Sequence, residues 1–333
     1  MKNKLTPQNI ILILIVCFVP LLLFGIDLLA RLLFDNFGFD LPIPGASSIL
    51  RILALTGLYV LLAVGLNIVC GYTGLLDLGY VGFYLVGGYT VGLLMTRFGI
   101  SYWIALPLAV LNGAFWGLLR GVPTLRLTGD YFAIVTFGFA ELLYQIVKNE
   151  EWLIGNVNGM VNDIPRASIF GIELDQNLYH YYHILILIAL VVFVSYRLQH
   201  SRVGRAWVAI REDEQAAESM GINVSRYKSL AFAVSAAIGA LGGAFFTQLQ
   251  SNLAVEVFEF WESILILCMV VLGGMGNIRG AIIGGVIIGS LGEVLRIVLG
   301  FNPQLADARF LIFGVILILL MRYRPDGLVF RKT

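Results

Sequence analysis

Residues 229–250 read S-L-A-F-A-V-S-A-A-I-G-A-L-G-G-A-F-F-T-Q-L-Q and carry no charged side chain. At about 1.5 Å of rise per residue, a helix of this length crosses the roughly 30 Å hydrocarbon core of a bilayer. This stretch therefore predicts a transmembrane helix. The same pattern recurs along most of the chain.

Apolar stretches of similar length divide the chain into about ten candidate spans. Besides 229–250, the clearest are 8–30, 50–70, 76–96, 102–120 and 179–197. Four weaker ones, which are short or contain a charge, are 131–148, 259–275, 280–299 and 305–322. Only 13% of the 333 residues are charged, against about 25% in soluble domains. We expect an all-α polytopic membrane protein in which some helices are short or broken.

The charge pattern predicts the orientation. If the N-terminus is cytoplasmic, alternation places about two thirds of the 22 Lys and Arg residues on the cytoplasmic side, as the positive-inside rule requires. Both termini are then cytoplasmic. We interpret 1–333 as one transmembrane domain with two long loops, 149–178 outside and 198–228 inside. The net charge of +1 offers no basic excess of the kind typical of nucleic-acid binders.

The inner loop contains a predicted amphipathic helix at 204–221. One face holds Trp207, Ile210, Ala217 and Met220, and the other holds Arg211, Glu212, Glu214 and Glu218. Gly221 suits the left-handed position that ends many helices. Such a helix can simply lie on the bilayer. Its polar face is mostly acidic, however, and anionic headgroups would repel it, so a protein partner is the better interpretation.

Several motifs resemble those of one transporter family. Glu214-Gln-Ala-Ala217 followed by Gly221 matches the E-x-A-A-x-x-x-G coupling motif of ATP-binding-cassette (ABC) importer permeases, and 204–223 as a whole resembles LivM-type permease subunits of branched-chain amino acid importers. Four further segments are similar to the same family: G-L-L-D-L-G-Y-V-G-F-Y-L-V-G-G-Y at 74–89, L-R-L-T-G-D-Y-F-A-I-V-T-F-G-F-A-E at 125–141, E-S-I-L-I-L-C-M-V-V-L-G-G-M-G at 262–276 and R-P-D-G-L at 324–328.

The resemblance implies a multi-pass permease subunit of the prokaryotic inner membrane that imports Leu-, Ile- or Val-like amino acids. It also implies a LivH-like second permease, two ABC ATPase subunits and a periplasmic or surface substrate-binding protein as partners. The expected contacts to the ATPase are Arg211, Glu212, Asp213, Glu214, Ala216, Ala217 and Gly221. Independently, the sequence has no G-x-x-x-x-G-K-[ST] phosphate loop. We therefore expect a subunit that is not an enzyme and binds no cofactor, while partner subunits use the ATP.

Glycines and in-span acids are the candidates for the translocation pathway. Gly71-Tyr-Thr-Gly74 and Gly273-Gly-Met-Gly276 join apolar runs, where a broken helix can expose backbone polar groups to a permeant zwitterion. Asp77 and Glu141 are in-span acids with no obvious opposite charge nearby in sequence. Asp77 could instead cap the start of its span. The candidates are Gly71, Gly74, Asp77, Glu141, Gly273, Gly274 and Gly276. For any single glycine, close helix packing is the simpler explanation.

The remaining polar features give weaker predictions. The outer turn Gly155-Asn-Val-Asn-Gly159 departs from the family's usual T-G-G-P-N-G but keeps Asn158 and Gly159, which are candidates for docking the binding protein. His180 and His183 are too few for a closed zinc site, so no metal is expected. The three cysteines lie far apart and predict no disulfide.

Other functions remain open at this point. Related permeases carry urea, amides or other neutral amino acids, and the motifs above barely separate these substrates. An ion-coupled secondary transporter would also have about ten spans and broken helices, but it would need no coupling helix. A membrane-embedded enzyme would need a catalytic constellation, and the sequence shows none.

Overall fold

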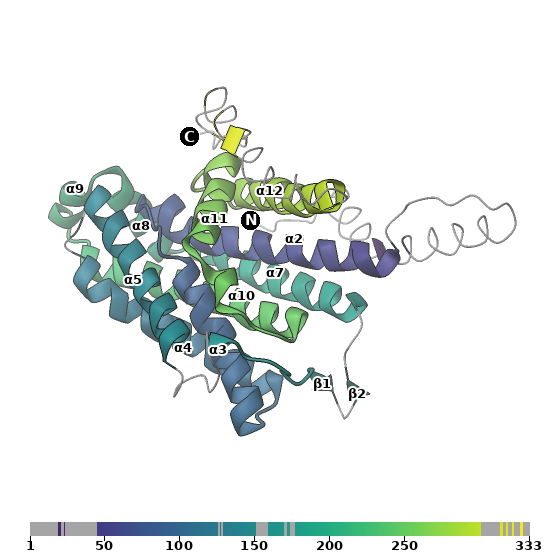
Figure 1. Cartoon of the computed structure of the whole chain (residues 1–333). Coiled ribbons are helices and arrows are strands. Elements are labelled where there is room, and N and C mark those ends of the chain that lie inside the picture. The colour runs from purple at the N-terminus through teal and green to yellow at the C-terminus, as the bar shows by residue number, and fades with distance from the viewer. Residues whose placement is uncertain are drawn as a thin grey trace, which may run out of the picture.

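The computed structural model describes residues 45–125, 127, 129–150, 159–169, 172, 173 and 177–300, with a few isolated residues outside these ranges (Figure 1). The described elements are α2 (Ala46–Asn67), the π-helix η1 (Ile68–Thr73), α3 (Val81–Phe98), α4 (Tyr102–Thr124), α5 (Asp130–Asn149), β1 (Ser168–Ile169), β2 (Ile172–Glu173), α7 (Asn177–Gln199), α8 (Arg202–Glu212), α9 (Glu214–Ser219), α10 (Val224–Gln250), the 3₁₀-helix η3 (Val255–Phe258), α11 (Phe260–Gly273) and α12 (Ile278–Gly300). The predicted spans 8–30 and 305–322 lie almost entirely outside the described residues.

The prediction of a helical membrane protein is confirmed. Within the described part of the chain, five helices are long and apolar enough to cross a membrane: Ala46–Thr73, Tyr102–Thr124, Asp130–Asn149, Asn177–Gln199 and Val224–Gln250. Phe260–Gly273 and Ile278–Gly292 are shorter apolar helices. The only sheet among the described residues is the small antiparallel pair of β1 and β2.

Two predicted helix boundaries are wrong. The span expected at 76–96 begins as a helix only at Val81, because Gly74 to Tyr80 forms an irregular segment. The single helix expected at 204–221 is two helices, since the backbone is extended at Asp213 (φ −158°, ψ 114°). In both places polar side-chain contacts replace the regular helical hydrogen bonds, as described below.

Small residues let the helices pack closely around α10. A Cβ atom on Gly87 of α3 would overlap the backbone of Ala240, and one on Gly117 of α4 would lie 2.6 Å from the Cβ atom of Ala236. Gly285 of α12 packs in the same way on Val60 of α2. Close packing of this kind is what a small-xxx-small pattern provides in a membrane.

The segments between helices gather at two ends of the bundle. At one end, α8 and α9 lie beside the end of α2, at the left of Figure 1. At the other end, Val161 pairs with Leu253, and the amide of Ala167 donates to Oε1 of Gln248 at 2.8 Å. Segments predicted to lie on the same side of the membrane therefore meet in space.

Candidate functional site

The first part of the site is the helix pair α8–α9, which is firmly attached to the membrane helices. Ser201 caps α8, because its Oγ accepts hydrogen bonds from the amides of Val203 and Gly204. Trp207 is fully buried; its Nε1 donates to the carbonyl oxygen of Tyr227 at 2.8 Å, and its ring stacks on Tyr72 with 6.3 Å between the ring centroids. Helix α8 is thus held to both η1 and α10.

A second set of contacts positions α9. Asp213 caps this helix, with its Oδ1 accepting from the amide of Ala216 at 2.9 Å. Glu214 forms an ion pair with the buried Lys228 of α10 at 2.6 Å. Ala217 packs into a small apolar cluster with Ile210. These contacts explain the break at Asp213, since a continuous helix would lose the cap.

The predicted ATPase contacts fall into two groups. Glu214 pairs with Lys228, Ala217 is buried, and Arg211, although exposed, donates from its guanidinium to the Gly71 carbonyl. Glu212, Asp213, Ala216 and Gly221 are exposed. Gly221 has φ +84°, which confirms the predicted helix stop. The coupling role of all these residues stays a prediction.

Met220 was predicted to share one helical face with Trp207, Ile210 and Ala217, but those three side chains are buried and Met220 is not. The break at Asp213 rotates the second helix relative to the first. Met220 is 84% exposed as a result. An apolar side chain standing this far out at the end of the helix pair is well placed to contact a partner.

The two glycine segments predicted for the pathway meet each other next to α8. Arg211 Nη1 donates to the carbonyl oxygen of Gly71 at 2.6 Å, and the amide of Gly276 donates to Oδ1 of Asn67 at 2.8 Å. A Cβ atom on Gly71 would overlap both the Gly276 nitrogen and the Asn67 side chain. We call Asn67, Gly71, Arg211 and Gly276 the glycine junction. The Gly71 carbonyl and the Gly276 amide already have protein partners in this conformation.

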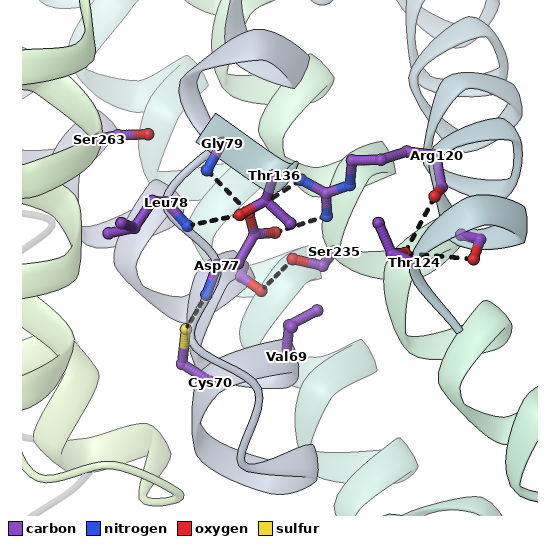
Figure 2. A network of polar contacts seen from close by, with 12 residues as sticks. Val69, Cys70, Asp77, Leu78, Gly79, Arg120, Thr124, Thr136, Ser235 and Ser263 are labelled. Atoms are coloured by element: carbon purple, nitrogen blue, oxygen red, sulfur yellow. Dashed lines mark hydrogen bonds and ion pairs between the residues drawn. The ribbon is translucent and has the colours of Figure 1, made fainter. Parts of the chain in front are cut away.

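The second part of the site is the irregular segment Gly74 to Tyr80, which a buried ion pair fastens to α4 (Figure 2). Arg120 donates from Nη1 to Oδ1 of Asp77 at 2.8 Å and from Nη2 to Oδ2 at 2.5 Å. Both side chains are at most 1% exposed, and the guanidinium lies 4.4 Å from the ring centroid of Phe83. Asp77 has no opposite charge nearby in the sequence, and the fold supplies one from 43 residues away. Asp77 does not cap α3, because its Oδ1 accepts from the amide of Gly79 within the segment.

Side chains from several elements satisfy the backbone of this segment. The amide of Asp77 faces Sγ of Cys70, that of Leu78 donates to Oγ1 of Thr136, and that of Val81 donates to Oγ of Ser263. Figure 2 shows Cys70, Leu78 and Thr136 around the ion pair. Irregular backbone at membrane depth is tolerated only where protein or water satisfies it. These contacts explain why the chain can leave the helical path here.

The third part of the site is an open hollow of about 260 Å³ between α5 and the start of α11, lined by Glu141, Tyr144, Glu259, Phe260 and Trp261. Glu141 accepts a hydrogen bond from Nε2 of Gln145 at 2.7 Å, and Asn149 donates to Oε1 of Gln145 at 3.1 Å. The three polar residues form a stripe along α5. A polar stripe on a membrane helix is expected to face water or another protein.

On the opposite end from α8, the predicted docking turn is only partly visible. Asn158 lies outside the described residues. Gly159 is buried with φ +69°, and its carbonyl oxygen accepts from the Tyr89 hydroxyl at 2.5 Å. Its role in docking stays a prediction. His180 and His183 are buried among aromatic rings, including Tyr102 and Phe245. Within the described residues, no group of three or more His, Cys, Asp or Glu side chains could hold a metal ion.

Several residues of the site were not identified from the sequence. No site role was predicted for Arg120 or Lys228, yet each is 1% exposed and pairs with an acid on another element, 43 and 14 residues away respectively. No role was predicted for Asn67, which lies within an apolar run of the sequence. The sequence did hold a signal for Arg120. A positive charge at the end of one predicted span and an unpaired acid in another span suggest that the two side chains form an ion pair.

Comparison with known proteins adds a consistent result. Residues 48–321 match the family described as "Branched-chain amino acid transport system / permease component". The chain is 38% identical over 301 residues to the high-affinity branched-chain amino acid transport system permease protein LivM of Salmonella typhimurium, covering 84% of this chain and 69% of the relative. It is 26% identical over 319 residues to a probable LivM of Methanocaldococcus jannaschii (83% and 91% covered) and 25% identical over 302 residues to LivH of Escherichia coli (82% and 91% covered). No solved structure matches.

Proposed function

Because the chain belongs to the family of branched-chain amino acid transport permeases, we propose that it is the membrane permease subunit of an ATP-driven importer for leucine, isoleucine or valine. The observation that carries this proposal is the 38% identity to LivM over 84% of the chain. The similarity to LivH supports pairing with a second, related permease. The subunit itself carries out no chemistry, and two separate ATPase subunits hydrolyse the ATP.

In this proposal the whole chain, 1–333, is one permease domain of about ten spans in the inner membrane, with both termini cytoplasmic. The positive-inside rule supports that orientation. The clustering of segments at the two ends supports the alternation of spans: Gly71, Arg211 and Gly276 lie together, while Val161 pairs with Leu253. The end with α8–α9 faces the cytoplasm and the ATPases. The opposite end faces the substrate-binding protein, through the 149–178 loop.

The exposed part of the helix pair α8–α9 would dock in a groove of an ATPase subunit. Docking of a short helix in a groove is a common recognition mode. Met220 is the apolar anchor, and Glu212, Ala216 and Gly221 lie at the rim, while Glu214 and Ala217 hold α9 on the permease. Closure of the ATPases then tilts the helix pair and changes the side to which the substrate cavity opens.

Of the predicted pathway residues, Glu141 has the most suitable surroundings. It is the only one of the set that lines the hollow between α5 and α11, where carboxylates and aromatic rings meet. A carboxylate suits the ammonium group of an amino acid, and aromatic walls suit a branched apolar side chain. The polar groups of Gly71, Asp77 and Gly276 have internal partners in this conformation. Any pathway role of these residues would need a second conformation.

The experiment is uptake into vesicles that contain this chain, a companion permease, the ATPase subunits and the binding protein. Labelled leucine should enter the vesicles only when ATP is present on the side of the membrane that holds the ATPase subunits. Excess unlabelled isoleucine or valine should lower this uptake by competition. If only urea or small amides compete, the substrate is one of those compounds and not a branched-chain amino acid. Uptake that ignores ATP and follows a proton or sodium gradient would refute the importer.

A narrower test addresses the pathway. Glu141→Gln should lower leucine uptake by at least about tenfold, since loss of one charged contact costs about 1.5–3 kcal/mol. Glu256→Gln is the matched control, because Glu256 is exposed on η3 and does not line the hollow. Equal uptake by both variants would remove Glu141 from the pathway.

A further inference from the structure

Arg211 makes an unusual contact for a residue at the end of an exposed helix. It lies in the last turn of α8, yet its Nη1 donates at 2.6 Å to the carbonyl oxygen of Gly71, near the end of the membrane helix formed by α2 and η1. The last carbonyl groups of a helix lack partners within it, and the negative end of the helix dipole attracts a cation. The guanidinium of a peripheral helix thus caps the end of a membrane helix.

The same guanidinium also lies close to the turn between α11 and α12. A Cβ atom on Gly276 would lie 2.8 Å from Arg211 Nη1 and 2.9 Å from the Gly71 oxygen. The amide of Gly276 in turn donates to Oδ1 of Asn67, on α2. Arg211 therefore lies where two membrane elements that are far apart in the sequence meet, and the hydrogen bond from Gly276 to Asn67 joins those elements to each other.

The element that Arg211 caps is wound differently from the α-helix before it. Residues Ile68–Thr73 form a π-helix, a rare conformation that often marks functional sites. A separate contact keeps α8 in place, because Trp207 stacks on Tyr72 and donates to the Tyr227 carbonyl. Loss of the Arg211 side chain should therefore break the polar link without detaching α8.

We propose that Arg211 is a positioning residue that passes the displacement of α8–α9 to the glycine junction, and so moves the end of α2 and the α11–α12 turn together. This inference rests on the proposed importer function. It gives the guanidinium of the exposed Arg211 a role within the permease, at the Gly71 carbonyl, in place of a contact to the ATPase. Movement of α8 pulls on Gly71 and Gly276 at once, because one guanidinium lies where the two meet.

The test uses the complete complex in vesicles and measures leucine uptake and ATP hydrolysis in the same sample. Arg211→Gln should lower the amount of leucine imported per ATP by about fivefold or more, the lower end of typical coupling between sites. Arg211→Lys keeps the positive charge but lacks the forked guanidinium. Its ratio of imported leucine to hydrolysed ATP should therefore lie between those of Arg211→Gln and the wild type. Arg202→Gln is the matched control, since it removes an exposed charge from the first turn of the same helix.

The outcomes separate this inference from the proposed function. If the wild-type complex shows no ATP-driven uptake, the importer function fails. If the wild type imports and Arg211→Gln keeps the wild-type ratio, the inference alone is overturned. If Arg211→Gln releases the ATPase subunits during purification, Arg211 is a docking contact and the inference is also overturned. A merely structural role would lower the yield of complex and leave the ratio per intact complex unchanged.

Discussion

Replacement of Asp77 by Asn tests how strongly the buried ion pair stabilises the irregular segment. The amide keeps the shape of the carboxylate and can still accept from the Gly79 amide, so only the charge is removed. Arg120 then stays charged and 1% exposed, between the rings of Phe83 and Phe232, with no anion beside it. We expect a large loss of stability from this single change.

The magnitude follows from burial. Removing one partner of a fully buried ion pair typically costs about 3–5 kcal/mol, because the remaining charge is uncompensated. Since each 1.4 kcal/mol is about tenfold in an equilibrium constant, the unfolded fraction should rise by roughly 100-fold or more. The assay is equilibrium unfolding of the purified permease in detergent micelles, followed by tryptophan fluorescence.

The double variant Asp77→Asn/Arg120→Gln should lose less stability than the sum of its two single variants, because no charge is left alone in it. Arg279→Gln is the control, since Arg279 is exposed and its side chain should contribute within about 0.5 kcal/mol. If the two single variants are as stable as the Arg279→Gln control, the claim that the ion pair is buried in the purified permease is refuted.

Three further predictions concern single contacts. Gly79→Ala should reduce the yield of folded permease and lower its Tm, because a Cβ atom there would overlap the Thr136 carbonyl oxygen. Gly138→Ala is the control and should leave Tm unchanged, because the space around Gly138 is open. Equal Tm values for the two variants would contradict the close approach of Gly79 to Thr136. Trp207→Phe should cost about 1 kcal/mol by removing the hydrogen bond to Tyr227, measured by the same unfolding assay, and no loss would mean that the stack on Tyr72 alone holds α8. Met220→Ser should weaken ATPase binding by at least about tenfold in a pull-down titration, since burial of a Met side chain is worth about 1.5–3 kcal/mol. Met160→Ser, at the opposite end of the bundle, should not weaken it. Equal binding by the two variants would exclude Met220 from the interface.

The positions of the membrane helices could be predicted because hydrocarbon imposes a length and an absence of charge on each of them. The run at 229–250 lies within α10, Val224–Gln250, and 179–197 lies within α7, Asn177–Gln199. Helix ends were less predictable, because polar side chains decide them. The start of α3 at Val81 depends on Thr136 and Ser263, whose distance from the segment is not visible in a sequence.

The site was predicted less completely than the fold. The motif at 204–221 identified the correct segment, but periodicity alone carried the helix through Asp213 and so misplaced Met220. A local signal was present, since Asp213 precedes Ala216 by three residues, the spacing of an N-cap bond. The pairing of Asp77 with Arg120 and the meeting of Gly71 with Gly276 are contacts between distant segments. Two in-span charges of opposite sign hint at the first contact, but no local pattern indicates the second.

The contacts of the irregular segment also constrain the order in which the protein can be built during synthesis. The amide of Val81 depends on Ser263, and that of Leu78 depends on Thr136. A nascent chain that has emerged only as far as α3 has neither partner. The amides of Leu78 and Val81 therefore reach their final partners only after Thr136 of α5 and Ser263 of α11 have been made. A truncation before residue 263 should leave the Val81 amide without its partner, and so give a product that quality-control proteases recognise.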